Sequence, residues 1–261
     1  MSVKEAVLAQ PSLVALWDFQ EEAGQPRVSQ GPHRYVLEEM AGGVRRVEDG
    51  VLGPYSAEIT PGQWLRAARR ETPALNIGGP DAKLTVAAWV KRHRKPLMTR
   101  DGNPNGPWFK ECEFIAGIWN ETGEKRQYGM FLNLGIWDSK EQLCGHVSAI
   151  GGPTPGYRYC MDASIGQTPL PEDEWLFLAI TYDGLYARSY VNGKLDARPE
   201  RNPYYYPGGL YDGGPDGADF TVGAVDRLHS IGNFFAGRLG GLAVFDRALT
   251  EEELLALHSL R

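Results

Sequence analysis

Cysteine is scarce in this chain, with three residues among 261. An odd and sparse set favours reduced thiols over a disulfide framework, and we expect Cys112, Cys144 and Cys160 to be free. They also lack the C-x-x-C spacing of zinc sites, so no zinc is predicted there. The fold must therefore depend on a hydrophobic core, for which the 42% hydrophobic content is sufficient.

Long apolar runs are missing as well. No stretch approaches the length of a membrane span, and Met1 to Gln10 has a single lysine and no apolar run of signal-peptide length. These absences predict a cytoplasmic protein without a membrane partner. The sequence also shows no repeat, low-complexity tract or linker, so we expect one domain over residues 1–261.

Positive charge is not in excess. Lys and Arg number 27 against 33 Asp and Glu, and the net charge is −6. A nucleic-acid-binding protein needs a basic face, so we expect no nucleic-acid partner. The densest basic run, residues 91–95, directly follows an apolar strand. We interpret it as a solvated strand end, with a polyanion-binding patch as the alternative.

Glycine and proline are plentiful, at 32 and 18 residues, which suits many short strands joined by turns. Strand-like apolar runs occupy residues 13–19, 84–90, 114–119, 128–134, 175–182, 185–191, 220–225 and 235–245. Asp183-Gly184 and Asn192-Gly193 tolerate positive φ and predict hairpin turns. One helix is predicted after Thr250, which forms a capping box with Glu253.

Two tryptophans lie in apolar runs long enough to cross a core. Trp89 and Trp175 are therefore predicted to be buried between the two layers of a sandwich.

Four stretches carry a resemblance to a known family: "LVALWDFQEEAG", "LTVAAWVKR", "DEWLFLAITYDGLYARSYVNGKLDA" and "FFAGRLGGLAVFDRALTEEELLAL". Their order resembles the laminin-G-like jelly-roll family of the concanavalin A-like lectin and glucanase superfamily, from about Ser12 to His258. Residues 94–170 match poorly and form a subgroup-specific region. The resemblance implies an all-β, two-sheet antiparallel jelly-roll sandwich. It also implies sugar binding or adhesion, or, in a minority of relatives, glycoside hydrolysis or polysaccharide cleavage by a lyase.

Calcium binding is common in that family, but this chain departs from its pattern. Residues 28–31 read Val-Ser-Gln-Gly where relatives have Asp-x-Ser-Gly, and residues 240–241 are both glycine where relatives have an Asp. Ca²⁺ needs roughly six to eight oxygens, so we expect no metal or other cofactor. Asp212, Asp216 and Asp219 form a separate cluster. We interpret it as a turn whose carboxylates bond their own backbone, with a metal site as the alternative.

A polar strand face points to a cleft. If residues 144–149 form a strand, then Cys144, His146 and Ser148 share one face, and Gly145 and Val147 share the other. A polar face opposite small residues is typical of a strand that lines a cleft.

The following loop adds groups that suit a sugar. After the rigid Gly-Pro segment 151–156 come Tyr157, Arg158, Tyr159 and Asp162. Aromatic rings cover the C–H face of a pyranose, and Arg and Asp bond its hydroxyls. The alternative is a loop that the two tyrosines pack on the sandwich edge.

Two further aromatic residues complete the predicted ligand-binding set. Trp119 lies in the subgroup-specific region, and Tyr205 lies in a loop, residues 202–209, in which three tyrosines are framed by prolines. All three tyrosines cannot be buried in one loop, so we expect an aromatic platform there, with edge packing as the alternative.

Two functions follow from this set. The first is a carbohydrate-recognition domain that binds an oligo- or polysaccharide on its concave sheet and adjoining loops. The second is a carbohydrate-active enzyme in which His146 is the general acid or base, assisted by Tyr157 and Asp162. A glycosidase would need two carboxylates flanking the bond, and the nearest motif, residues 111–113, reads Glu-Cys-Glu and lacks a third member.

Overall fold

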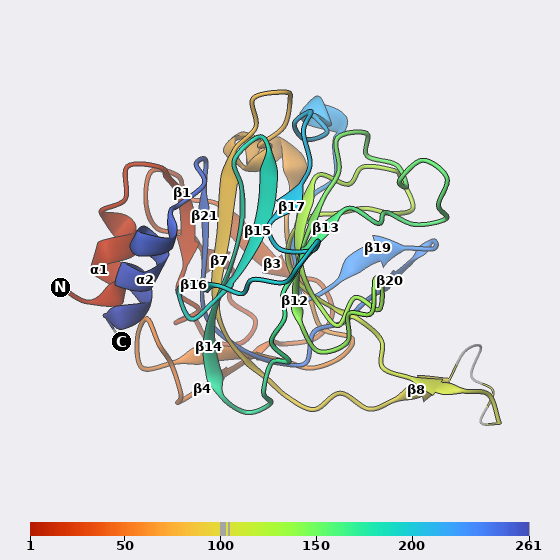
Figure 1. The fold of residues 1–261 in the computed structure, drawn as a ribbon. Coiled ribbons are helices and arrows are strands. Elements are labelled where there is room, and N and C mark those ends of the chain that lie inside the picture. Colours follow the sequence, from red (N-terminus) through yellow and green to blue (C-terminus); the bar gives the residue numbers. More distant parts are fainter. Residues whose placement is uncertain (100–102, 104, 261) are drawn as a thin grey trace.

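Two antiparallel β-sheets form most of the molecule and lie face to face (Figure 1). The computed structural model describes residues 1–99, 103 and 105–260. The larger sheet has nine strands in the order β16-β15-β14-β7-β21-β5-β4, with β1 beside β21 and β17 beside β15. Its strands are β1 (Leu13–Trp17), β4 (Arg45–Val47), β5 (Ser56–Ile59), β7 (Leu84–Arg92), β14 (Trp175–Tyr182), β15 (Tyr186–Val191), β16 (Lys194–Leu195), β17 (Tyr204–Tyr205) and β21 (Gly237–Phe245).

The smaller sheet has eight strands in the order β13-β12-β11-β10-β18-β6-β3-β2. These are β2 (Arg27–Val28), β3 (Val36–Glu39), β6 (Leu65–Ala67), β10 (Glu113–Ile118), β11 (Tyr128–Leu132), β12 (Leu143–Val147), β13 (Ala163–Ile165) and β18 (Phe220–Val222). Two small hairpins project from the sandwich: β8 (Met98–Thr99) with β9 (Trp108–Phe109), and β19 (Val225–Arg227) with β20 (Ser230–Gly232). The predicted antiparallel jelly-roll sandwich is confirmed.

The predicted hairpins form where the turn residues placed them. β14 and β15 pair from Leu178–Val191 to Tyr182–Ala187, and Gly184 in the connecting turn has φ +97°. Asn192 and Gly193 also have positive φ and return the chain into β16. Each turn therefore uses a residue type that tolerates the left-handed region.

The main core lies between the two sheets. Trp17 of the nine-stranded sheet stacks on Phe220 of the eight-stranded sheet, with ring centroids 5.6 Å apart. Both rings are buried within one continuous apolar cluster drawn from both sheets. This layer holds the sandwich together.

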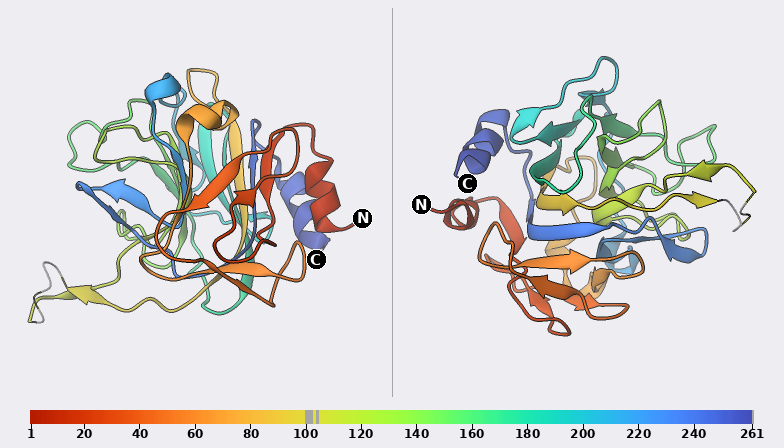
Figure 2. Two further views of the ribbon diagram at one scale, coloured as in Figure 1. Left: turned by 180° about the vertical axis from the view of Figure 1, so that it is seen from behind. Right: turned by 90° about the horizontal axis from the view of Figure 1, so that it is seen from below.

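A second apolar layer covers the outer face of the nine-stranded sheet. Helices α1 (Val3–Leu8) and α2 (Glu251–Ser259) lie together on this side, near both chain termini (Figures 1 and 2). Leu254 and Leu257 of α2 join a buried cluster with Trp89 and Phe177. The C-terminal helix is confirmed. The structure adds α1, which the sequence analysis did not include and which has its own capping box of Ser2 and Glu5. Neither helix is long and apolar enough to cross a membrane.

The positions of two tryptophans differ from the prediction. Trp89 is fully buried, but it stacks on Phe177 beneath the helices and does not lie between the sheets. Trp175 is partly exposed at the end of β14, where its Nε1 donates to Asp49 at 2.9 Å and Lys91 lies above its ring. The reason is that β7 and β14 are buried on both faces, so their apolar runs do not indicate which layer a residue enters.

The basic run 91–95 is also not a solvated strand end throughout. Arg92 is fully buried and donates to Glu113 on the opposite sheet at 2.9 Å and to Glu141 at 2.6 Å. Lys95 is buried too, with its ammonium 2.7 Å from Glu111. Carboxylates from the subgroup-specific region therefore neutralise these cations inside the protein.

Candidate functional site

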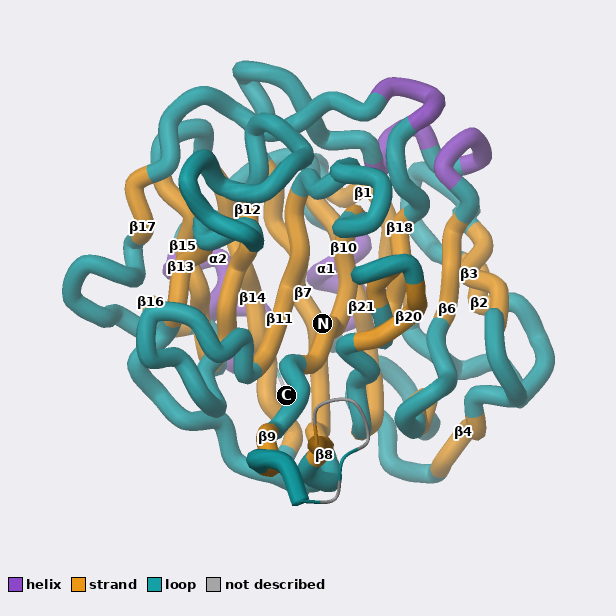
Figure 3. Tube along the Cα trace, turned by 90° about the vertical axis from the view of Figure 1, so that its right-hand side faces the viewer, coloured by secondary structure: helices purple, strands orange, loops and turns teal. Residues whose placement is uncertain are grey.

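Loops, and not helices, cover the outer face of the eight-stranded sheet (Figure 3). Pairing across its strands aligns one row of residues: Glu38, Arg66, Thr221, Gly117, Gly129, His146 and Ala163. The two glycines lie in the middle of this row, on adjacent strands. A Cβ at Gly129 would lie only 2.8 Å from the ring of Phe131 and 3.0 Å from that of Phe114. The missing side chain at Gly129 therefore leaves room for these two aromatic rings to pack on the sheet.

A cleft of about 420 Å³ opens over the β10–β12 part of this face. We call it the His146 cleft. Segments far apart in the sequence line it: residues 109–112, 119, 121, 133–136, 146, 159–160, 227 and 233. Only the fold brings these segments together.

His146 lies at the base of the cleft. Its ring stacks on Trp119 with centroids 4.6 Å apart and meets the edge of Phe131 at 5.2 Å. The side chain is only 4% exposed, and its Nδ1 lies 2.8 Å from the backbone carbonyl of Asp162. Burial lowers the pKa of His146 to about 4, so the imidazole is neutral at pH 7. The carbonyl requires the proton on Nδ1, which leaves Nε2 as an acceptor.

Within β12 the predicted faces are those seen in the structure, but Ser148, which was predicted to share the face of His146, follows the end of the strand and does not line the cleft. Cys144 joins His146 on the outer face, in an apolar cluster with Phe114 and Phe131. Val147 belongs to the core between the sheets, and a Cβ at Gly145 would approach Ile180 of the opposite sheet. Strand β12 therefore presents His146 to the cleft.

Charged groups of both signs surround the cleft. Lys110 and Arg227 contribute positive charge, and Glu111 and Glu121 contribute negative charge. Salt bridges and hydrogen bonds fix several of them: Lys110 with Glu141 at 2.8 Å, Arg227 with Asn233 at 2.8 Å, and Glu111 with Lys95 at 2.7 Å. The cleft thus offers oriented donors and acceptors with no surplus of one sign of charge.

The three consecutive residues of the predicted site loop point to different places. Tyr159 is 38% exposed and lines the His146 cleft. Arg158 lies over the Tyr159 ring at 5.3 Å and lines a smaller adjoining hollow. Tyr157 is 48% exposed and packs edge-on against Trp137, outside the cleft. Of this loop segment, only Tyr159 faces the same cavity as His146.

Asp162 and Ser148 hold the loop in place. The Asp162 carboxylate accepts hydrogen bonds from the hydroxyls of Tyr204 at 2.8 Å and Thr154 at 2.5 Å. The buried Ser148 hydroxyl accepts from the backbone N–H of Gly151 at 3.0 Å. Asp162 meets His146 only through its backbone carbonyl. The structure therefore does not assemble His146, Tyr157 and the Asp162 carboxylate into one catalytic group.

Tyr205 lies away from the cleft, on strand β17 at the edge of the nine-stranded sheet. Its exposed ring contacts Tyr186, with centroids 5.4 Å apart. Its two tyrosine neighbours turn inward: Tyr204 bonds Asp162, and the Tyr206 hydroxyl accepts from the backbone N–H of Ala149. As expected, the loop buries only part of its tyrosine set.

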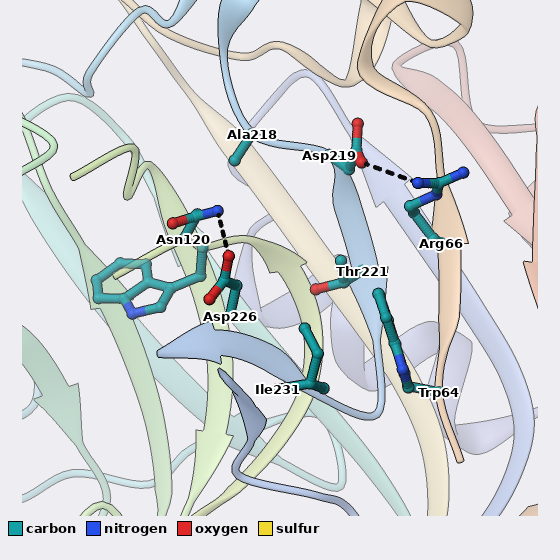
Figure 4. A pocket seen from close by; sticks show the side chains of 9 residues that line it. Trp64, Arg66, Asn120, Ala218, Asp219, Thr221, Asp226 and Ile231 are labelled. Carbon is teal, nitrogen blue, oxygen red and sulfur yellow. Dashed lines mark hydrogen bonds and ion pairs between the residues drawn. The ribbon is translucent and has the colours of Figure 1, made fainter. Parts of the chain in front are cut away.

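A second hollow on the same face was not predicted from the sequence, and we call it the Arg66 pocket. Trp64, Arg66, Asn120, Asp219 and Asp226 contribute to its walls (Figure 4). A signal for it exists in the sequence. Residues 64–67 read Trp-Leu-Arg-Ala, and the alternation places the arginine outward because its two neighbours are apolar. The run is only three residues long as a strand, too short to distinguish from a loop.

Each carboxylate of the acidic cluster has at least one protein partner. Asp212 accepts from the backbone N–H of Gly214 at 2.9 Å, as the turn interpretation predicts. The other two carboxylates do not bond their own turn as predicted: Asp216 forms an exposed ion pair with Arg70, and Asp219 accepts from the backbone N–H of the distant Arg69 at 2.7 Å. Within residues 1–99, 103 and 105–260, no three His, Cys, Asp or Glu side chains are grouped to hold a metal ion.

The closing strand has a steric reason for its glycines. A Cβ at Gly241 would lie 2.4 Å from Leu52 and 2.9 Å from Trp89. An aspartate cannot occupy this position while Leu52 and Trp89 pack against the strand. All three cysteines are free, and burial raises the pKa of Cys144 to about 12 and of Cys160 to about 11, which keeps both thiols protonated and unreactive.

Comparisons with known proteins bear on this face. The family model described as the concanavalin A-like lectin/glucanases superfamily matches residues 69–255. No curated protein sequence matches the chain.

Several solved structures share the fold. The fourth domain of an extracellular arabinanase from Geobacillus stearothermophilus, in complex with arabinotriose, is 16% identical with a TM-score of 0.59, and the match covers 95% of this chain and 98% of that domain. The binding domain of botulinum neurotoxin DC, in complex with SialylT, is 10% identical with a TM-score of 0.58, covering 100% of this chain and 53% of that one. The sialidase of Trypanosoma rangeli, in complex with the inhibitor DANA, is 13% identical with a TM-score of 0.58. The match covers 96% of this chain and 33% of the sialidase chain. At these identities the likeness shows the fold alone.

Proposed function

Because this chain belongs to the concanavalin A-like lectin/glucanases superfamily, we propose that it is a carbohydrate-recognition domain that binds an oligo- or polysaccharide in the His146 cleft. One observation carries the proposal. The cleft combines partly exposed aromatic rings, Tyr159 and Phe109, with polar groups whose orientation hydrogen bonds already fix. Sugar sites need both, because a pyranose has an apolar C–H face and a rim of hydroxyls.

The balance of charge in the cleft supports a saccharide over other ligands. Two cations and two carboxylates surround it, so a strongly charged ligand would meet repulsion from one pair. Hydroxyl groups can accept from Lys110 or Arg227 and donate to Glu111 or Glu121. Two of the structurally similar domains were solved with arabinotriose and with SialylT, which agrees with a carbohydrate ligand.

The test begins with a glycan array and continues with calorimetry on each glycan that binds. Tyr159→Ala should weaken binding about tenfold, since it removes an aromatic face worth ~1.4 kcal/mol. Tyr157→Ala is the matched control, because it removes another exposed tyrosine ring two residues away, which lies outside the cleft. Equal loss in both variants, or in neither, would contradict the assignment of the cleft.

Catalysis is the second candidate, and one observation favours it. His146 and Tyr159 line the same cleft, and His146 has a neutral imidazole that could accept a proton at Nε2. Each glycan that binds should therefore be incubated with the protein and assayed for new reducing ends and unsaturated products. If the site only binds, His146→Ala weakens affinity by about 1–2 kcal/mol and no product forms. If it is catalytic, the same variant lowers turnover at least ~100-fold while binding stays near normal.

A further inference from the structure

The β19–β20 hairpin divides the outer face of the eight-stranded sheet into two hollows. Because side chains alternate along a strand, Arg227 faces the His146 cleft, whereas Asp226 and its cross-strand partner Ile231 face the Arg66 pocket. Trp119 lines both hollows. The Arg66 pocket is therefore the direct neighbour of the cleft and shares a wall with it.

The Arg66 pocket is small and has the chemistry of a sugar site. Its volume is about 130 Å³, less than a third of the 420 Å³ of the His146 cleft, so it can admit a single sugar unit but not a chain. Trp64 supplies aromatic surface, Arg66 on β6 supplies a donor, and Asp219, just before β18, supplies an acceptor (Figure 4).

The guanidinium of Arg66 has N–H donors that make no hydrogen bond to the described residues of the protein. Its ion-pair distances, 3.5 Å to Glu38 and 3.8 Å to Asp219, are too long for hydrogen bonds. Within the part of the chain that the structure describes, no hydrogen bond from this guanidinium is found, and its Nε is buried without a partner. Its terminal nitrogens are therefore available to acceptors that enter the pocket.

The two carboxylates of the pocket differ in how many of their oxygens already accept hydrogen bonds. Both oxygens of Asp226 already accept hydrogen bonds, from Thr122 at 2.7 Å and from Asn120 at 3.2 Å. Asp219 accepts from the backbone of Arg69 with one oxygen, and its other oxygen has Arg66 at 3.8 Å as its ion-pair partner. Asp219 is thus the acceptor open to a ligand, and Asp226 anchors the hairpin to the β10–β11 turn.

This arrangement favours an uncharged polyol. A pair of neighbouring hydroxyls can accept from Arg66 and donate to Asp219, with the C–H face of the ring against Trp64. Two carboxylates against one guanidinium leave the pocket with one net negative charge, which opposes an acidic sugar. We propose that the Arg66 pocket is a second subsite that holds one neutral sugar unit of the same saccharide chain that occupies the His146 cleft. This inference rests on the proposed function.

The experiment measures affinity against chain length. Ladders of cello-, xylo- and arabino-oligosaccharides from one to six units are titrated by calorimetry into the wild type, Arg66→Ala, Trp64→Ala and Tyr159→Ala. In the wild type the affinity should rise at least tenfold along the ladder that binds. Arg66→Ala and Trp64→Ala should remove this rise and leave the shortest bound member unchanged, which also shows that both variants are folded. Tyr159→Ala should weaken every member.

Arg70→Ala is the matched control, because it makes the same charge change on the next segment, at a 78% exposed side chain outside the pocket. It should retain the rise with length. If Tyr159→Ala weakens binding but Arg66→Ala and Trp64→Ala leave the rise intact, or if only acidic glycans bind, the second subsite is overturned and the proposed function stands. If no glycan of the array or ladders binds, both are overturned.

Discussion

The two outer faces of this sandwich are built from the same kind of antiparallel sheet, but one face is closed and the other contains hollows. On the nine-stranded sheet, helices α1 and α2 lay their apolar sides on Trp89 and Phe177 and close the face. On the eight-stranded sheet, loops and the β19–β20 hairpin cover a row with two central glycines and leave two polar hollows. Helices bury an apolar stripe continuously, whereas loops must keep their backbone polar groups satisfied and pack less completely. The loop-covered face is therefore the one that can hold a ligand.

The largest effect is expected on the closed face. Trp89→Ala should lower the free energy of unfolding by about 3–5 kcal/mol, because it leaves a cavity beneath both helices. Urea unfolding followed by circular dichroism measures the loss. Trp175→Ala is the control, since this ring is partly exposed and should cost clearly less. A reversed order would mean that the helices do not close that face.

A pH-dependent effect is expected from the open face. The pKa of His146 is about 4 in the folded protein and near 6.5 when the ring is exposed in the unfolded chain, so the unfolded state binds more protons between these values. The full stability is present above pH 6.5 and falls as the pH drops from about 6.5 to about 4, by up to ~3 kcal/mol.

Unfolding curves at several pH values for the wild type and His146→Phe test this. The variant keeps a ring between Trp119 and Phe131 but cannot bind the proton. Its free energy of unfolding should therefore not show the fall between pH 6.5 and 4 that is assigned to His146. His229→Gln alters an exposed histidine at the tip of the β19–β20 hairpin and should keep the slope. An unchanged slope in His146→Phe would refute the assignment of this pH dependence to the cleft.

The smallest of these effects concerns the glycine row. Gly129→Ala should cost about 1–3 kcal/mol, because its new methyl group would collide with the rings of Phe114 and Phe131. Gly43→Ala, where a Cβ meets nothing closer than 3.7 Å, should change stability by less than ~0.5 kcal/mol. Thermal unfolding of the pair decides whether the space above the row is filled by these rings. Equal melting temperatures would show that it is not.

Much of the architecture could be predicted from the sequence because it depends on local signals. Period-two alternation identified β12 and its outward His146, the Asp183-Gly184 turn identified the β14–β15 hairpin, and the capping box identified α2. The site was predicted less well. Of the eight residues predicted to bind a ligand, Trp119, His146 and Tyr159 line the cleft. Ser148 and Asp162 hold the adjoining loop, and Arg158 lines a neighbouring hollow. Tyr157 packs on Trp137, and Tyr205 lies on the opposite sheet.

The sequence by itself determined that this chain forms strands, where they turn back, and which residues of one strand share a face, because each of these depends on neighbours along the chain. Only the tertiary structure decided which face is closed and which residues meet. Trp89 faces the helices because β7 is apolar on both sides, so its own pattern cannot state the direction. Arg66 reaches Asp219 only through strand order, because β6 pairs with β18 in the folded sheet. That order is fixed by long-range pairing and packing, which no local sequence pattern encodes.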